Sequence, residues 1–317
     1  MLLAWQEFLV GKKSRKDVQE FERNLMENII SLHQDLANKT YRHGSYHAFN
    51  ISDPKPRNIH KANVRDRLLH HAIYRVLYPY FDPKFITDSY SCRLNKGTHR
   101  AMNRFREFAY KVSKNNMRTC WILKCDITKF FASIDHDMLK KILAKHIEDR
   151  DILRFLGGVI DSFHTPQGVS LGKGLPLGNL TSQLLVNVYM NEFDQFMKHR
   201  LKVKYYVRYA DDFVILSEGR NQLITLRRYI AIFLKEELKL ELPPNKIFVK
   251  TSASGIDFLG WVHFPEHRVL RTTTKRRMLK NLKANYENET LQSYLGMLSH
   301  GNTQLTQNEI RQLAHAL

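Results

Sequence analysis

The sequence predicts an α+β protein in which helices cover one face of an antiparallel sheet. Segments with apolar residues at helical spacing alternate with short strand-like runs in the central part of the chain. Two apolar runs flank a tight Ala-Asp-Asp tip within residues 202–219, as in a β-hairpin. With 317 residues, 43% of them hydrophobic and 11% aromatic, the chain can form a core in one large or two to three compact lobes, and it is not a disordered protein.

The first third of the chain predicts two helices separated by extended segments. Residues 17–38 carry apolar residues at helical spacing, which indicates one amphipathic helix. The run 47–52 is extended, and Pro54 and Pro56 favour a loop after it. A second helix covers residues 64–80 and ends near Pro79. Within it, His70 and His71 are adjacent rather than four residues apart, so we interpret them as packing or surface residues.

The central and last parts alternate strands with helices. Trp121–Cys125 is strand-like and ends at Asp126, and Asp135 is placed to cap a following helix. A glycine loop at 175–183 precedes a long helix, and the hairpin at 202–219 precedes an amphipathic helix at 220–242. Residues 255–271 alternate like a pair of short strands, and the last fifty residues are helical, with a basic start.

The charge of the chain points to a polyanionic partner. Fifty Lys and Arg against 31 Asp and Glu give a net charge of +19, which suits nucleic acid or an acidic membrane surface. We expect no membrane span, because no run of about 18 uncharged apolar residues exists, and the start does not have the pattern of a secretory signal. Three cysteines without metal-ligand spacing predict neither a disulfide framework nor a zinc site, so we expect a cytoplasmic protein.

Three acidic residues on neighbouring strand-like elements stand out in this basic chain, namely Asp126 and the pair Asp211–Asp212. Clustered carboxylates repel one another unless cations neutralise them, and two Mg²⁺ ions suit both the oxygen ligands and a phosphate-containing substrate. Taken singly, each would be better explained structurally, Asp126 as a strand-ending or capping residue and Asp211–Asp212 as turn residues. An ordinary hairpin would use Asn-Gly or Asp-Gly at the tip, which favours the functional interpretation.

These motifs together resemble a reverse transcriptase over roughly residues 20–300. The tip YADD resembles the catalytic hairpin of that family, residues 123–135 the strand with the first metal ligand, and residues 175–183 the loop and helix under the template and incoming nucleotide. Residues 53–73 and 88–101 resemble the two fingers motifs, and FLGW at 258–261 the primer grip. The resemblance implies a right-hand polymerase with fingers at 1–120 (including an N-terminal extension), a palm at 121–265 and a short helical thumb at 266–317.

The resemblance also implies roles for individual residues. Asp126, Asp211 and Asp212 would hold two Mg²⁺ ions, with the Ile127 carbonyl as a further ligand. Phe131 would be the steric gate against a ribose 2′-hydroxyl, unless it is a core aromatic beside Phe130. Further contacts to the dNTP or template would come from Lys55, Arg57, Arg93, Leu177, Gly178 and Gln183. Lys246 would either protonate the leaving pyrophosphate or be solvated.

Two groups of residues would contact the nucleic acid. The primer grip would consist of Phe258, Leu259, Gly260 and Trp261. The basic stretch from Arg268 to Lys283 is the expected surface along the RNA/DNA duplex, with Lys275, Arg276 and Arg277 as candidate phosphate contacts.

The loop at 175–183 has a pattern of its own. Reverse transcriptases commonly have Gln-Gly here and end the motif in Ser-Pro, whereas this chain has Leu177 and Gln183. That pattern resembles diversity-generating retroelements, whose enzymes copy a template RNA with errors at adenines. In that class the template RNA is structured and also primes synthesis, and a small basic pentameric accessory protein takes part. No maturase, DNA-binding or endonuclease extension is expected after the thumb.

Two alternatives remain at this point. Leu177 is a neutral difference if the chain belongs to another bacterial class of reverse transcriptase. A group II-like or retron-type enzyme would then make complementary DNA without a mutagenic role. A protein of a different kind, a catalytically inactive RNA-binding scaffold, is disfavoured by the intact set of three aspartates.

Overall fold

A computed structural model describes residues 1–51, 56–163, 172–284 and 286–316, and the chain forms two compact units. Unit 1 contains Met1–Thr87, Ile127–Arg200 and Ala231–Glu241; unit 2 contains Asp88–Asp126, Leu201–Ile230 and Leu242–Leu317. Each unit therefore combines segments that are far apart in the sequence. The three-part division into fingers, palm and thumb stays a prediction.

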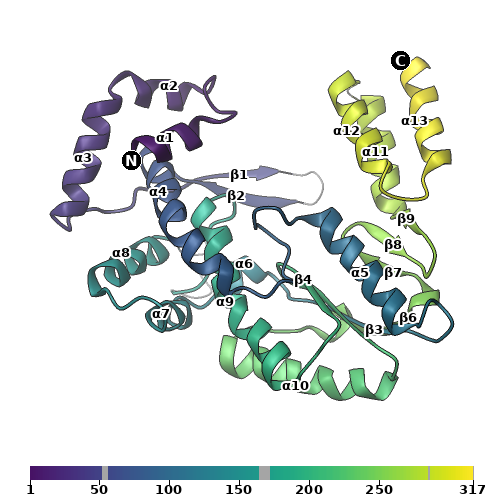
Figure 1. The fold of residues 1–317 in the computed structure, drawn as a ribbon. Coiled ribbons are helices and arrows are strands. Elements are labelled where there is room, and N and C mark those ends of the chain that lie inside the picture. The colour runs from purple at the N-terminus through teal and green to yellow at the C-terminus, as the bar shows by residue number, and fades with distance from the viewer. Residues whose placement is uncertain (52–55, 164–171, 285, 317) are drawn as a thin grey trace. The chain divides into compact units, whose positions relative to one another are not determined.

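Unit 1 is mainly helical, with one two-stranded sheet (Figure 1). Its elements are α1 (Leu2–Leu9), α2 (Lys16–Arg23), α3 (Leu25–Ala37), β1 (His47–Ile51), β2 (Arg57–Lys61), α4 (Val64–Phe81), the 3-10 turn η1 (Asp82–Lys84), α6 (Phe130–Ser133), α7 (His136–Ala144), α8 (Arg150–Asp161), α9 (Leu180–Gln195), the π-helix η2 (Phe196–Arg200) and the end of α10 (Arg220–Leu238).

The single helix predicted for residues 17–38 is wrong, because the structure has α2 and α3 there. Asn24 separates them with φ −117° and ψ 39°, outside the helical region. The Asn28 side chain donates to the Phe21 carbonyl at 2.9 Å and so satisfies one acceptor near the end of α2. The break allows Val18 on α2 and Leu32 on α3 both to be fully buried.

The two fingers-like segments of unit 1 form a hairpin and a helix. The extended run predicted at 47–52 is confirmed over His47–Ile51, which is β1. Residues 52–55 of the predicted loop around Lys55 lie outside the described residues, and its end at Arg57 is already the start of β2, which pairs antiparallel with β1. The predicted helix at 64–80 is confirmed as α4. Pro79 lies in its last turn, where a missing N–H removes only one hydrogen bond, and the helix ends two residues later.

The core of unit 1 forms where α4 contacts α9. The predicted cap at Asp135 is confirmed, because its carboxylate accepts from the Met138 amide at 2.9 Å at the start of α7.

In the core, both α4 and α9 bury several aliphatic side chains, among them Leu68, Leu69, Leu184, Leu185 and Val188. The two helices therefore give the loop before α9 a rigid support.

Unit 2 contains two sheets and the C-terminal helices (Figure 1). Its elements are α5 (Thr98–Val112), β3 (Trp121–Asp126), β4 (Tyr206–Tyr209), β5 (Asp212–Ser217), the first part of α10, the 3-10 turns η3 (Pro244–Lys246) and η4 (Ser252–Ser254), β6 (Ile247–Thr251), β7 (Ile256–Phe258), β8 (Trp261–His263), β9 (Arg268–Leu270), α11 (Thr272–Ala284), α12 (Asn288–Leu298) and α13 (Gln304–Ala316).

The larger sheet has the strand order β4-β5-β3-β6, with antiparallel neighbours throughout. The predicted strand at 121–125 and the hairpin at 202–219 are confirmed. The sequence did not predict β6, which is a short edge strand with partly exposed side chains. The prediction of two strands at 255–271 is wrong, because β7, β8 and β9 form a separate three-stranded sheet.

Two cores hold unit 2 together. Helix α5 buries Phe105 and Phe108 against Ile122, Val214 and Leu216 of the larger sheet, in a cluster that also includes β7 residues. The C-terminal helices have their own apolar cluster around Met278, Leu282, Leu291, Leu298 and Ile310. In the described part of the chain, no helix has both the length and the apolar character needed to cross a bilayer.

Candidate active site

Two of the three aspartates lie opposite each other on adjacent strands. In the β3–β5 register, Asp126 is the partner of Asp212, and both residues are at the ends of their strands. Directly opposite residues of an antiparallel pair point to the same face, with Cβ atoms roughly 5 Å apart. Asp211 precedes Asp212 in the hairpin turn. The structure therefore brings the three predicted metal ligands to one corner of the sheet in unit 2.

The hairpin turn carries backbone strain. Ala210 has φ +55°, in the left-handed region that costs a residue with a Cβ roughly 1–2 kcal/mol. The buried Arg208 side chain supports the turn, because Nη1 donates to the Ala210 carbonyl at 3.1 Å and Nη2 donates to Ser89 Oγ at 3.0 Å. The predicted site residue Arg93 donates to the Ser89 carbonyl at 3.1 Å. The segment at 88–93, which belongs to the same unit as the β4–β5 hairpin, thus helps to hold that hairpin in place.

Strand alternation places Lys124 on the same face as Asp126. Its Nζ is 3.2 Å from Asp212 Oδ2 and donates to the Asp257 carbonyl at 2.6 Å, and the side chain is 10% exposed. Lys246 Nζ lies 2.5 Å from Asp126 Oδ1, and the Lys246 side chain is more exposed than that of Lys124. Asp126 and Asp212 therefore each form an ion pair with a different lysine. Sequence reasoning named Lys246 and missed Lys124. The alternation of side chains along β3 could have found Lys124, because residues two apart point to the same face of the sheet.

The Asp212 carboxyl has an unusual electrostatic environment. Burial raises its pKa to about 7; the Lys124 ammonium opposes this shift, and the nearby Asp126 and Asp211 add to it. Asp212 Oδ1 is buried and has no hydrogen-bond partner among the described residues. A buried oxygen without a donor costs free energy, which a bound cation would recover. The site therefore fits a hard divalent cation at Asp212.

The described residues do not contain a preformed metal cluster. No group of three or more His, Cys, Asp or Glu side chains within them is arranged to hold an ion. The three aspartates occupy one corner, but lysine ammonium groups contact Asp126 and Asp212. A metal would therefore compete with Lys246 for Asp126, whereas on Asp212 the Lys124 ammonium contacts Oδ2 and Oδ1 has no partner among the described residues.

The predicted template loop lies in unit 1 and is held by β2. The Leu177 carbonyl accepts from the His60 amide at 3.1 Å, and Leu177 is partly exposed. Gly178 has φ +106°, and a Cβ there would be 3.0 Å from Ile59 Cγ2, so this position requires glycine. The Gln183 carbonyl accepts from the Asn187 side chain at 3.3 Å. The loop is thus anchored through its main chain.

The other predicted substrate residues of unit 1 have different environments. Arg57 begins β2 and is exposed, whereas Lys55 lies outside the described residues. Phe130 is 3% exposed and Phe131 is partly exposed, as expected if one of the two packs inward. The Phe131 carbonyl accepts from the Leu175 amide at 2.8 Å, and the Ile127 side chain is buried.

A buried histidine fixes the start of α9, which sequence reasoning did not predict. Burial, then repulsion from His43 and His71, lowers the pKa of His70 to about 3, so its ring is neutral and has one N–H. Its Nε2 lies 3.0 Å from His43 Nε2, and its Nδ1 lies 2.6 Å from Thr181 Oγ1. One ring nitrogen therefore donates and the other accepts, which ties Thr181 of the loop motif to α4.

The FLGW segment is the tight turn between β7 and β8. Phe258 pairs with Trp261, and Leu259 and Gly260 have φ +54° and +86°. Phe258 and Trp261 are buried. Of the predicted duplex contacts on α11, Lys275 forms an ion pair with Glu309 of α13 at 2.7 Å, while Arg276, Lys280 and Lys283 are exposed. The exposed basic residues of α11 are therefore Arg276, Lys280 and Lys283, and only Arg276 belongs to the predicted set of Lys275, Arg276 and Arg277.

The α+β fold is that of a nucleic-acid polymerase. A family model described as reverse transcriptase (RNA-dependent DNA polymerase) matches residues 51–263. The chain belongs to this family.

Two relatives show how far the likeness to known proteins extends along the chain. The chain is 26% identical to protein YkfC of Escherichia coli over 246 residues, which cover 67% of this chain and 62% of that protein. It is 25% identical to the group II intron-encoded protein LtrA of Lactococcus lactis over 280 residues, covering 67% of this chain and 44% of LtrA. The chain thus spans less than two thirds of these relatives.

The fold is similar to that of telomerases. The apo telomerase of Candida tropicalis matches with a TM-score of 0.56 and 11% identity, covering 86% of this chain and 57% of that one. The Candida albicans telomerase in complex with a fragment of telomeric RNA matches with a TM-score of 0.55 and 13% identity, covering 86% and 54%. These likenesses concern the α+β polymerase fold.

Proposed function

We propose that this chain is an RNA-directed DNA polymerase that makes complementary DNA from a template RNA. The observation that carries the proposal is the register of β3 and β5, which sets Asp126 opposite Asp212 beside Asp211. The buried, unpaired Asp212 Oδ1 supports a cation at this corner. Family membership supports the reaction class, and the net charge of +19 suits a nucleic-acid partner.

Asp126, Asp211 and Asp212 would hold the two Mg²⁺ ions, with the Ile127 carbonyl as an additional ligand. Such ions activate an attacking hydroxyl and stabilise the leaving pyrophosphate in an in-line displacement. Lys124 holds Asp212 through Oδ2 and leaves Oδ1 for a cation. Lys246 must leave Asp126, to which it is bonded here, before it can donate a proton to pyrophosphate.

The remaining roles follow from residue chemistry. Arg57 and Lys55 would bind the triphosphate, with a contribution from Arg93, and Phe131 would exclude a ribose 2′-hydroxyl. The FLGW turn would hold the primer end, and the exposed basic residues of α11 would follow the duplex backbone.

The test of the polymerase proposal is primer extension with Mg²⁺. Asp211→Ala, and the double replacement of Asp211 and Asp212 by Ala, should abolish DNA synthesis while RNA binding persists, because the basic surface is unchanged. Glu218→Ala is the matched control, since this exposed carboxylate directly follows β5. Full extension by the purified double variant would refute the assignment.

We further propose that the enzyme belongs to a diversity-generating retroelement and copies adenines with errors. The support is the apolar Leu177 where the family commonly has Gln, together with Gln183. A structured RNA that also primes, and a small basic pentameric accessory protein, would be its partners. The relationship to LtrA favours a second candidate, a group II-like enzyme without a mutagenic role.

The geometry of the loop makes Leu177→Gln a clean test of these two candidates. The anchor of Leu177 is its backbone carbonyl, so a new side chain leaves the hydrogen bond to β2 intact. Gln can donate and accept hydrogen bonds near the nascent base pair, whereas Leu can do neither. A gain of about 1.4 kcal/mol in discrimination would lower errors tenfold.

We would sequence complementary DNA made from an adenine-containing template, with Leu177→Met as the apolar control. The expected result is fewer substitutions opposite adenine for the Gln variant, with synthesis retained, and no change for the Met variant. An unchanged spectrum in the active Gln variant would exclude Leu177 as the source of infidelity. Faithful copying of adenine by the wild type would favour the group II-like candidate.

A further inference from the structure

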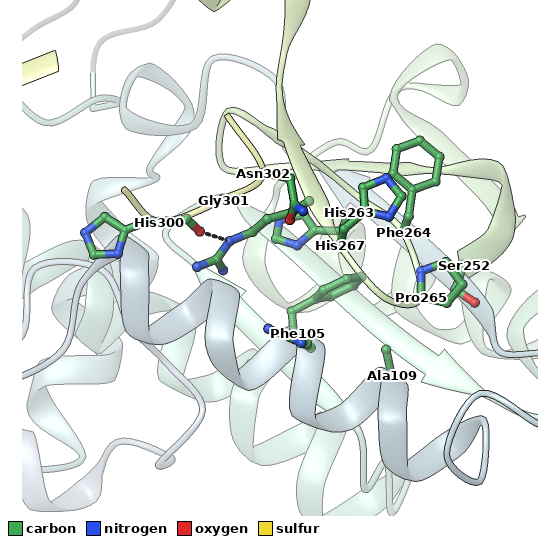
Figure 2. Close-up of a pocket in the computed structure, with 12 residues that line it drawn as sticks. Phe105, Ala109, Ser252, His263, Phe264, Pro265, His267, His300, Gly301 and Asn302 are labelled. Atoms are coloured by element: carbon green, nitrogen blue, oxygen red, sulfur yellow. Dashed lines mark hydrogen bonds between the residues drawn. The ribbon is translucent and has the colours of Figure 1, made fainter. Parts of the chain in front are cut away.

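A cavity in unit 2 lies between α5, the β7–β8–β9 sheet and the loop after α12. Its volume is about 80 Å³, several times the roughly 10–15 Å³ that one buried water needs. Figure 2 shows Phe105 and Ala109 on α5, with His263, Phe264 and His267 on the facing hairpin. None of the residues that line it belongs to the aspartate site.

The lining of this cavity is basic and polar. It comprises Phe105, Arg106, Ala109, Ser252, His263, Phe264, Pro265, His267, Arg268, His300, Gly301 and Asn302, and it contains no Asp or Glu. His263 is buried, and burial lowers its pKa to about 4, so its ring is neutral. The fixed positive charge of the cavity therefore comes from Arg106 and Arg268.

Arg268 is held in place by neutral acceptors. Its Nε donates to the His300 carbonyl, the contact drawn in Figure 2, and its Nη1 donates to Asn103 Oδ1 at 3.1 Å. The Arg268 carbonyl in turn accepts from the Asn302 amide at 2.9 Å. These bonds fix the guanidinium at the cavity wall without neutralising its charge.

Arg106 adds a second positive charge without a counter-ion. Among the described residues, no carboxylate forms an ion pair with Arg106 or Arg268, and the two guanidinium groups are close enough to repel each other. Two residues earlier on α5, Arg104 is paired with both Asp88 and Glu107. Acidic side chains therefore neutralise the charge of Arg104, whereas the positive charges of Arg106 and Arg268 at the cavity have no acidic partner among the described residues.

We propose that this cavity binds a phosphate oxyanion between Arg106 and Arg268, with the Ser252 hydroxyl and the Asn302 side-chain amide as further donors. Two like charges at one cavity without an acid are unfavourable until an anion enters, and guanidinium groups suit phosphate oxygens. The phosphate comes from the backbone of bound nucleic acid or from a free phosphate or pyrophosphate. The site goes beyond the proposed polymerase chemistry, because no step of that chemistry uses it.

The cavity is mechanically connected to the FLGW turn. The Arg268 guanidinium lies 5.7 Å from the Trp261 ring centroid, and a Cβ on Gly301 would be 2.1 Å from Trp261 Cζ3. The loop that closes the cavity is therefore packed directly on the aromatic residue of that turn. An anion bound here would also stabilise the position of this loop against the hairpin.

The nucleic-acid source is tested by the salt dependence of RNA affinity. Arg106→Gln should flatten the log–log slope by roughly 0.7 to 0.9, the value of one phosphate contact. Arg100→Gln is the matched control, because Arg100 is exposed on the same helix, does not line the cavity and donates to the Asn95 carbonyl. A second pair of variants places a negative charge in the short turn η4. Ser252→Asp puts it in the cavity lining, and Ser254→Asp, the control, puts it outside the lining.

The free-anion source is tested by calorimetric titration of the full chain with inorganic phosphate and with pyrophosphate. EDTA is present, so that no divalent cation can bridge pyrophosphate to the aspartates. Saturable binding that is lost in Arg106→Gln and in Ser252→Asp, but kept in both controls, would assign the site to a free anion.

A cavity-specific loss in either experiment supports the phosphate site and identifies its source. The proposal is overturned if Arg106→Gln and Ser252→Asp behave like their controls in both experiments. Either result is independent of the polymerase assignment, which the Asp211→Ala variant tests separately.

Discussion

Removing the Asp212 charge should change how the stability of the metal-free protein depends on pH. Burial raises the pKa of this carboxyl to about 7, against an ordinary value of 3.8. Between these pH values the folded protein keeps a proton that the unfolded chain has lost. The free energy of unfolding therefore falls as pH rises through this window, and Asp212→Asn should abolish that component.

The size of the effect follows from the shift of about three units in pKa. Each unit corresponds to about 1.4 kcal/mol, so keeping Asp212 ionised without metal costs at most about 4 kcal/mol. The side chain is only 18% exposed, so solvent screens little of this cost. The Lys124 ammonium already reduces it, as its opposing effect on the pKa shows.

The assay is urea unfolding in EDTA at pH 5, 6, 7 and 8 for the wild type and Asp212→Asn. The wild type should lose stability relative to the variant as pH rises from 5 to 8, by about 2.7 kcal/mol, because about two pH units of the window lie between pH 5 and the pKa of about 7. Mg²⁺ should recover this loss in the wild type alone, because a bound cation neutralises the carboxylate. Glu218→Gln, an exposed carboxyl in the same unit, controls for the loss of one charge. Parallel pH profiles for the wild type and Asp212→Asn would refute the reasoning.

Three other changes test separate parts of the structure. Replacing the exposed Arg276, Lys280 and Lys283 by Ala should lower the salt slope of RNA affinity by roughly 2 to 3, and an unchanged slope would place the duplex elsewhere. Gly301→Ala should lower the free energy of unfolding by roughly 1–3 kcal/mol in urea titrations, since its methyl group would overlap an indole ring; a neutral effect would contradict this packing. Thr181→Val should cost roughly 1–3 kcal/mol by leaving a buried imidazole nitrogen unpaired, while Thr181→Ser should restore stability; equal losses in both variants would exclude the hydrogen bond.

Sequence reasoning predicted the elements around the candidate site because their signals are local. The apolar run before Asp126, the Ala-Asp-Asp tip and the cap at Asp135 each depend on a few neighbouring residues, and the structure has the corresponding strand, hairpin and helix start. The break at Asn24 was missed because the apolar spacing continues through it. The edge strand β6 was missed because it is short and only partly buried.

The sequence by itself determined the family and the α+β class, since motif order and periodicity are written along the chain, and it named three acidic residues as candidate metal ligands. Only the tertiary structure decided that Asp126 lies opposite Asp212, that Lys124 contacts one of these carboxylates and that buried Arg208 supports the hairpin turn. Strand order and register depend on contacts between residues far apart in sequence. That Arg106 and Arg268 lie at one cavity, with no carboxylate paired to either among the described residues, likewise becomes visible only when distant segments enclose that cavity.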